Sequence, residues 1–103
     1  MSTIRIRARV QGDVAEVRSL IRHPMETGLR KDKKTGNAIP AHFIQEVKCE
    51  HNGKVVMNAL WSAAISTNPY LAFDIKGAKS GDKVKISWSD NEGKSDTAEV
   101  TVG

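Results

Sequence analysis

Cysteine, proline and aromatic residues are all scarce in this sequence. Its 103 residues include one cysteine and three prolines, and only 5% of them are aromatic. A lone cysteine excludes a disulfide framework within the chain. Apolar runs are only a few residues long, too short to span a membrane. No apolar signal region precedes the first alternating segment, so the residues alone predict a cytoplasmic protein.

The composition is that of a folded globular protein. Hydrophobic residues make up 39% of the chain and charged residues 27%, a balance that argues against a disordered chain. The length suffices for one hydrophobic core and is too short for two. We therefore expect a single domain that spans residues 1–103.

Positive charge is concentrated in one segment, residues 22–41. The whole chain has a net charge of +4, and this segment alone holds five basic residues against two acidic ones. Nucleic-acid-binding surfaces often interleave aromatic side chains with basic ones, whereas here no aromatic residue precedes Phe43. We therefore expect no nucleic-acid partner, and we interpret the charge as one that helps to steer an acidic partner.

Apolar and polar residues alternate along most of the chain. A period of two indicates half-buried β-strands, and turn residues such as Gly12-Asp13 and Asn52-Gly53 separate them. Seven short strands without helical periodicity predict an all-β fold, an immunoglobulin-like antiparallel β-sandwich. The expected strands cover residues 4–10, 15–21, 43–49, 55–61, 71–76, 83–89 and 98–102.

The alternation also assigns side chains to the two faces of each strand. In the expected third strand it places Phe43, Gln45, Val47 and Cys49 on one face and Ile44 on the opposite face. Cys49 shares a face with Phe43 and Val47, which favours the interpretation that it is a small buried hydrophobic residue. The alternative is a reactive thiol that bonds to a partner.

Three aromatic residues are assigned in the same way. Trp61 and Trp88 lie on strand faces otherwise filled by aliphatic residues, so we expect both to be core anchors. Tyr70 alternates onto the face opposite Leu71 and Phe73. It is the better candidate for an exposed aromatic contact.

Residues 22–41 form a long segment without alternation, between the expected second and third strands. In a small all-β domain such a connection is commonly a lid, a binding loop or a disordered linker. Its beginning combines the rigid Pro24, the flexible apolar Met25 and Gly28, a mixture that suits a surface able to repack against another protein. From chemistry alone, a contact surface and a mobile connection are equally good interpretations.

Cys49 with His23, His42 and His51 is the one group of residues that suggests metal chemistry. Imidazole and thiolate ligands suit iron, copper or zinc, and an immunoglobulin-like fold with these residues suggests a mononuclear metal redox protein of the superoxide reductase type. One histidine is lacking for that family's four-imidazole site, and His51 is more simply a hairpin residue. His23 and His42 flank the long loop and can approach each other, but two imidazoles do not make a metal site.

Signatures of nucleotide binding or nucleophilic catalysis are lacking. No glycine-rich turn is followed by the Lys-Ser or Lys-Thr of a phosphate loop. No serine lies in a nucleophile elbow. We therefore predict no catalytic residue, no metal and no cofactor.

Several segments occur in a fixed order: HPMETGLRKDKKTGNAIPAHF, FIQEV, HNGK, NPYLAF and GDKVKISWSDN. Together they closely resemble SoxZ, the family of small subunits in the heterodimeric carrier of bacterial thiosulfate and sulfur oxidation. The resemblance spans nearly the whole chain. It implies a non-catalytic subunit that binds SoxY, whose flexible, glycine-rich C-terminal arm carries sulfur intermediates on a cysteine. This chain ends in AEVTVG, without such an arm.

The resemblance also changes two expectations. It implies a periplasmic protein that is exported with its signal-bearing partner, against the cytoplasmic location predicted from the residues alone. It implies transient contact with the enzymes that load, oxidise and hydrolyse the bound sulfur. Without its partner, the chain can pair with a second copy of itself through a free apolar face. It favours the contact surface, and the predicted partner-binding residues are His23, Pro24, Met25, Glu26, Thr27, Gly28, Arg30, Phe43, Asn68, Pro69 and Tyr70.

Overall fold

The structure is a computed structural model that describes residues 3–62 and 65–103 of the chain. Within these residues it contains strands and no helix. The strands are β1 (Ile4–Gln11), β2 (Val14–Ile21), β3 (Ile44–His51), β4 (Lys54–Leu60), β5 (Tyr70–Lys76), β6 (Lys83–Asp90) and β7 (Ser95–Thr101).

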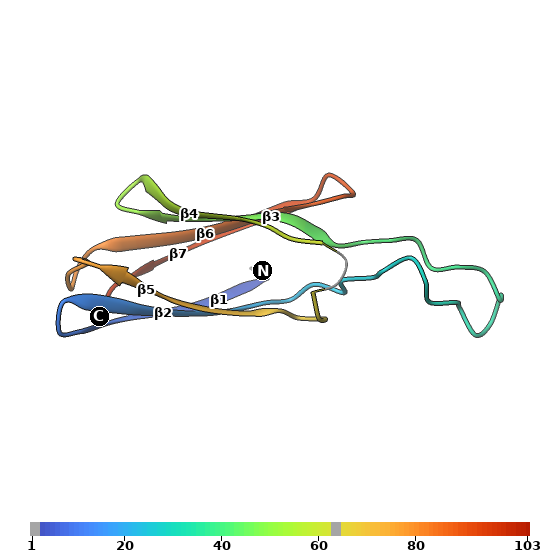
Figure 1. The fold of residues 1–103 in the computed structure, drawn as a ribbon, viewed down its shortest axis with the longest axis horizontal. Coiled ribbons are helices and arrows are strands. Elements are labelled where there is room, and N and C mark those ends of the chain that lie inside the picture. Colours follow the sequence, from blue (N-terminus) through green and yellow to red (C-terminus); the bar gives the residue numbers. More distant parts are fainter. Residues whose placement is uncertain (1–2, 63–64) are drawn as a thin grey trace.

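Two antiparallel sheets pack face to face (Figure 1). One has the strand order β1-β2-β5 and the other the order β4-β3-β6-β7. The seven strands confirm the predicted all-β sandwich, because each strand turns one face to the core and the other to solvent. Among the described residues, no helix is long and apolar enough to cross a membrane.

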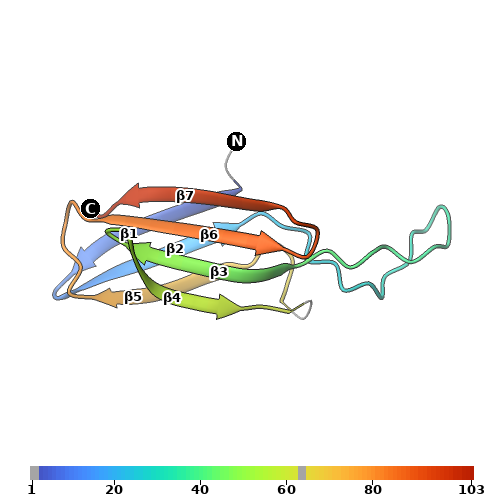
Figure 2. The same cartoon turned by 90° about the horizontal axis from the view of Figure 1, so that it is seen from above.

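The two edges of the sandwich differ. At one edge β1 packs beside β7, and the chain end joins β1, with the Val10 N–H donating to the Gly103 carbonyl oxygen at 2.9 Å. At the other edge lie β4 and β5, each the last strand of its sheet (Figure 2). Their outer edges pair with no other named strand, so this side of the sandwich is open.

Alternate residues of both sheets fill the core as the sequence pattern predicts. In β2 the inner residues Ala15, Val17 and Ile21 have no exposed surface, and in β6 Val84 and Ile86 are equally buried. Such burial stabilises each of the larger side chains by about 2 kcal/mol.

The third strand departs from the predicted alternation. Ile44 is fully buried and Gln45 is exposed, the reverse of the expected assignment, while Val47 and Cys49 lie inside as expected. The pairing of β3 with β6 shifts register between Ile44 and Glu46. This β-bulge adds one residue to the strand, so Ile44 and Val47 face the same way.

The aromatic predictions have two outcomes. Trp88 is in the core with 6% of its surface exposed, whereas Trp61, directly after β4, is half-buried and packs against the core. Tyr70 is 61% exposed, as predicted.

Residues 22–43 form an extension that projects from one end of the sandwich (Figures 1 and 2). It stretches the molecule to 53 Å, against 24 and 20 Å in the other directions. Its two halves are joined by short bridges, between Glu26 and His42 near the sandwich and between Lys31 and Ala38 further out. The long loop is thus a paired two-stranded projection, which we call the β2–β3 extension.

The bulge makes a testable prediction about β3. Replacing Ile44 by alanine removes a fully buried side chain and is expected to lower the free energy of unfolding by roughly 2–5 kcal/mol. Gln45→Ala, one residue away, is the control and is expected to change it by less than about 0.5 kcal/mol. Urea denaturation of both variants checks this, and equal effects would contradict the register described here.

Candidate functional site

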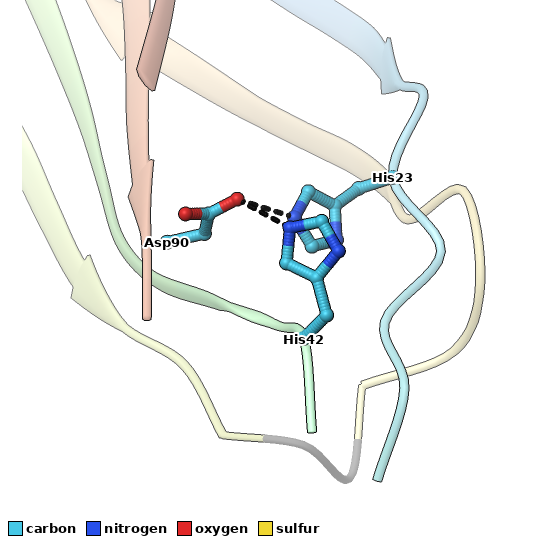
Figure 3. Close-up of side chains that lie close together, drawn as sticks. All are labelled: His23, His42 and Asp90. Carbon is cyan, nitrogen blue, oxygen red and sulfur yellow. Dashed lines mark hydrogen bonds and ion pairs between the residues drawn. The ribbon is translucent and has the colours of Figure 1, made fainter. Parts of the chain in front are cut away.

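Three side chains converge where the β2–β3 extension joins the sandwich (Figure 3). His23 follows β2, His42 precedes β3 and Asp90 ends β6. Each imidazole Nε2 lies within hydrogen-bond distance of the same carboxylate oxygen, Asp90 Oδ2, at 3.0 Å from His23 and 2.7 Å from His42. The two rings meet edge to face with centroids 4.5 Å apart. One carboxylate therefore joins both ends of the extension.

The remaining oxygen of Asp90 is also satisfied. Its Oδ1 accepts backbone N–H groups from Glu92 at 3.0 Å and Lys94 at 2.9 Å. Burial alone raises the pKa of this carboxyl, but the hydrogen bonds from His23, Lys94, His42 and Glu92 outweigh it and lower the pKa to about 2. Asp90 is thus a buried carboxylate that stays ionised because four donors surround it.

The proton position on His23 follows from its second nitrogen. The Met25 backbone N–H donates to His23 Nδ1 at 3.1 Å, so Nδ1 is an acceptor without a proton. Nε2 must then carry the proton and donate it to Asp90. A histidine that binds a metal has the opposite arrangement, in which the nitrogen away from the metal donates its N–H.

That proton decides how the cluster is interpreted. Ligand atoms of His23, His42 and Asp90 lie within 4.8 Å of one another, close enough to suggest a metal site. However, the protonated Nε2 of His23 points at the carboxylate, and a metal in its place would require Met25 to give up its hydrogen bond. The arrangement fits a hydrogen-bonded structural cluster, which we call the His-Asp-His cluster.

Met25 connects this cluster to the core. It is buried, and the Ile44 N–H donates to its sulfur at 3.4 Å. Its φ angle of 50° lies in the left-handed region, which costs a non-glycine residue about 1–2 kcal/mol. The bond to His23 and the buried side chain hold Met25 in this conformation.

The connection between β4 and β5 packs against the same base. The His23 N–H donates to Asn68 Oδ1 at 3.0 Å, and the Asn68 N–H donates to the His23 carbonyl at 2.9 Å. The Thr67 hydroxyl donates to the Pro24 carbonyl at 3.0 Å. Two segments that are distant in the sequence, around residues 23–28 and 67–70, therefore meet at one end of the molecule.

The predicted partner-binding residues are mostly gathered at this end, at different depths. Three of them lie in the interior, and the others are half-buried or exposed. The buried residues are His23, Met25 and Pro69, and the half-buried ones are Glu26, Gly28 and Phe43. The exposed residues are Pro24, Thr27, Arg30, Asn68 and Tyr70.

Sequence reasoning anticipated that His23 and His42 approach each other and missed Asp90. The expected sixth strand stops at residue 89, one residue short of Asp90, and the backbone turns directly after Asp90. The missed signal is its register, since Asp90 continues the inner face of Val84, Ile86 and Trp88. A charged residue at an inner position requires buried partners.

Four exposed apolar side chains lie toward the same end of the molecule, while Val55 and Val56 lie toward the other end of β4. Leu29 on the extension is 88% exposed and Leu60 at the end of β4 is 81% exposed, while Tyr70 and Leu20, paired across β5 and β2, are 61% and 37% exposed. Leu20 and Tyr70 are direct cross-strand neighbours, and neighbouring exposed apolar groups mark sites of protein contact.

Cys49 and His51 take no part in the cluster. Cys49 is fully buried in the core, as predicted, and burial, with a smaller contribution from Glu50, raises the pKa of its thiol to about 11. His51 bonds through Nε2 to Asp82 at 2.7 Å. Among the residues that the structure describes, the proposed four-residue metal set is therefore dispersed.

Comparison with known proteins identifies a family. The family model described as Sulphur oxidation protein SoxZ matches residues 4–101 of the chain. None of the proteins with curated function gives a significant match.

The charge of Asp90 predicts a pH-dependent stability. Because its pKa is lowered to about 2, the carboxylate contributes stability that is present above about pH 4 and is lost as the pH falls toward 2. We expect Asp90→Asn to lower the free energy of unfolding at pH 7 by about 2 kcal/mol and to flatten its acid dependence. Denaturation curves at several pH values measure both effects.

Asp74→Asn is the control for this experiment, since Asp74 lies exposed on β5. It is expected to change the stability by less than about 0.5 kcal/mol. If Asp90→Asn left stability and its pH dependence unchanged, the carboxylate would not hold the base of the extension.

Burial of Cys49 predicts an inert thiol. In the native protein we expect no reaction with a thiol-specific disulfide reagent at pH 8, because the thiolate is disfavoured and the sulfur is inaccessible. One equivalent should react after denaturation. Fast stoichiometric labelling of the native chain would contradict the description of Cys49 as a core residue.

Proposed function

The chain belongs to the SoxZ family of sulphur oxidation proteins, and from this premise we propose that it is the non-catalytic subunit of a sulfur carrier. The family gives it a role in sulfur oxidation and a partner within the Sox system. We propose that this partner is a SoxY-like subunit whose C-terminal arm carries sulfur intermediates on a cysteine. The family match over residues 4–101 is the observation that carries this proposal.

The end that bears the β2–β3 extension is the proposed partner-binding surface. Its exposed apolar groups include Leu29 on the extension, Leu60 at the end of β4, and Tyr70, two residues after Asn68. Apolar side chains at the centre of an interface supply most of its binding energy. The open edge along β4 adjoins this surface and is unpaired by any named strand.

The mechanism that we propose is one of positioning. The His-Asp-His cluster fixes both ends of the extension to the sandwich, so the extension meets the partner from a rigid base. The partner's arm would then start from a defined place and reach the enzymes that load and release sulfur. Cys49 cannot carry this cargo, because it is buried in a strand of the core.

The alternative function, a mononuclear metal redox protein, is not favoured. It requires His23 Nε2 to be free for a metal, whereas the Met25 N–H on Nδ1 leaves the proton on Nε2.

We also propose that the protein works in the periplasm and is exported with its signal-bearing partner. Fractionation of cells that express both subunits, or this subunit alone, tests that location.

Co-expression tests the carrier proposal directly. The chain and a SoxY-like subunit are expected to co-purify as a heterodimer, and Tyr70→Ala combined with Leu60→Ala should weaken the complex by roughly tenfold or more. Val56→Ala is a matched control, since Val56 is also exposed and apolar but lies toward the other end of β4. Size-exclusion chromatography and calorimetry measure association.

Three results would contradict the proposal. They are the absence of a complex with the SoxY-like subunit, turnover of a sulfur substrate by the isolated chain, and tightly bound stoichiometric metal in the purified protein. If Val56→Ala weakened the complex as much as the double variant, the binding surface would be misplaced.

A further inference from the structure

The outer face of the three-stranded sheet carries a compact group of arginines that the partner-binding surface does not use. Arg5, Arg7 and Arg9 are the outward residues of β1, and Arg18 lies beside them on β2. We call this the arginine face. Across the three strands its outward residues form the rows Arg5–Leu20–Tyr70, Arg7–Arg18–Ala72 and Arg9–Glu16–Asp74.

The guanidinium groups of this face are available for a ligand. All four arginines are exposed, and among the described residues the only ion pair that any of them forms is between Arg18 and Glu16, at 3.5 Å. Alternate residues of a strand are roughly 6.8 Å apart, so β1 presents an evenly spaced row of cations. Arg5, Arg7 and Arg18 also line a shallow hollow together with Leu20 and Tyr70.

Stability of the fold does not account for this arrangement. Arg7 and Arg18 are direct cross-strand partners, and like charges placed opposite each other destabilise a sheet. An acidic residue at either position would instead form a favourable pair. A feature that opposes stability, yet lies on an exposed and hollowed surface, points to a binding role.

We propose that the arginine face binds the acidic surface of a second protein that visits the carrier transiently. Guanidinium groups in a row suit carboxylates, which they can bind in bidentate pairs, and a cationic face accelerates the encounter with an acidic partner. The first row of the face includes Tyr70, so a protein bound here would lie next to the proposed partner-binding surface. This inference rests on the proposed function.

Two other occupants fit the face less well. A nucleic-acid backbone fits less well because Glu16 and Asp74 share the third row with Arg9, which confines the positive surface to β1 and Arg18. A permanent subunit interface is depleted of charged residues at its centre, whereas charged side chains occupy the middle of this face. An acidic protein surface with limited contact area satisfies both conditions.

The test uses Arg7→Glu, a substitution that replaces a like-charge pair by an opposite-charge pair with Arg18. The folded protein should therefore keep its stability, while binding to an acidic ligand should weaken. The probe is a peptide with glutamate at every second position. It is titrated into the heterodimer at low and at high salt, and NMR follows the arginine side-chain N–H signals. Oligodeoxythymidylate of equal charge is titrated in parallel.

We expect the peptide to cause saturable chemical-shift changes at Arg5, Arg7 and Arg9. The binding affinity should fall at high salt, and Arg7→Glu should lower it roughly fivefold. Lys54→Glu makes the same charge change on an exposed residue of the other sheet and should reduce binding less than twofold. Equal losses in both variants, equal or tighter binding of the oligonucleotide, or no saturable shift would each overturn the inference.

The heterodimer itself separates this inference from the proposed function. Arg7→Glu should leave co-purification with the SoxY-like subunit intact. If the variant dissociated the two subunits, the face would belong to the permanent interface and the inference would be wrong. If the wild-type subunits failed to associate, the proposed function would fail, and the peptide titration on the isolated chain would still decide whether the face binds acidic ligands.

Discussion

The end of the molecule that bears the β2–β3 extension depends on one buried charge. The Asp90 carboxylate has no exposed side-chain surface, and it accepts hydrogen bonds from two imidazoles and two backbone N–H groups. A buried carboxylate is tolerated only where such donors compensate for lost water. His23 and His42 must therefore stay at their places, and with them the two ends of the β2–β3 extension.

Most of the fold could be predicted from the sequence because the sandwich has a simple rule. Each strand faces the core on one side only, so Val17 in β2 and Ile86 in β6 reveal their burial through their spacing. The same rule failed in β3, where a bulge turns Ile44 inward and Gln45 outward. A bulge changes the register of backbone pairing, and no residue type marked its position.

The candidate site was less accessible to such reasoning because its members are distant in the sequence. His23 and His42 lie 67 and 48 residues from Asp90. The pairing of β3 with β6 places His42 near Asp90, whereas His23 follows β2 and reaches Asp90 from the other sheet. The arginine face also depends on pairing, since the alignment of Arg7 with Arg18 is a property of the hairpin register. The alternation of Arg5, Arg7 and Arg9 along β1 is visible in the sequence, whereas their alignment with Arg18 is not.

The distribution of surface chemistry suits a subunit with two kinds of contact. Apolar groups such as Leu29 and Leu60 lie at the extension end, and a row of arginines runs along β1 of the three-stranded sheet. Apolar contact releases water and gives long-lived association, whereas exposed charge chiefly raises the rate of encounter and permits release. The proposed carrier subunit, which would remain bound to one partner and leave each enzyme after its step, requires both properties. Their placement side by side would let a visiting protein meet the cargo at the surface where it docks.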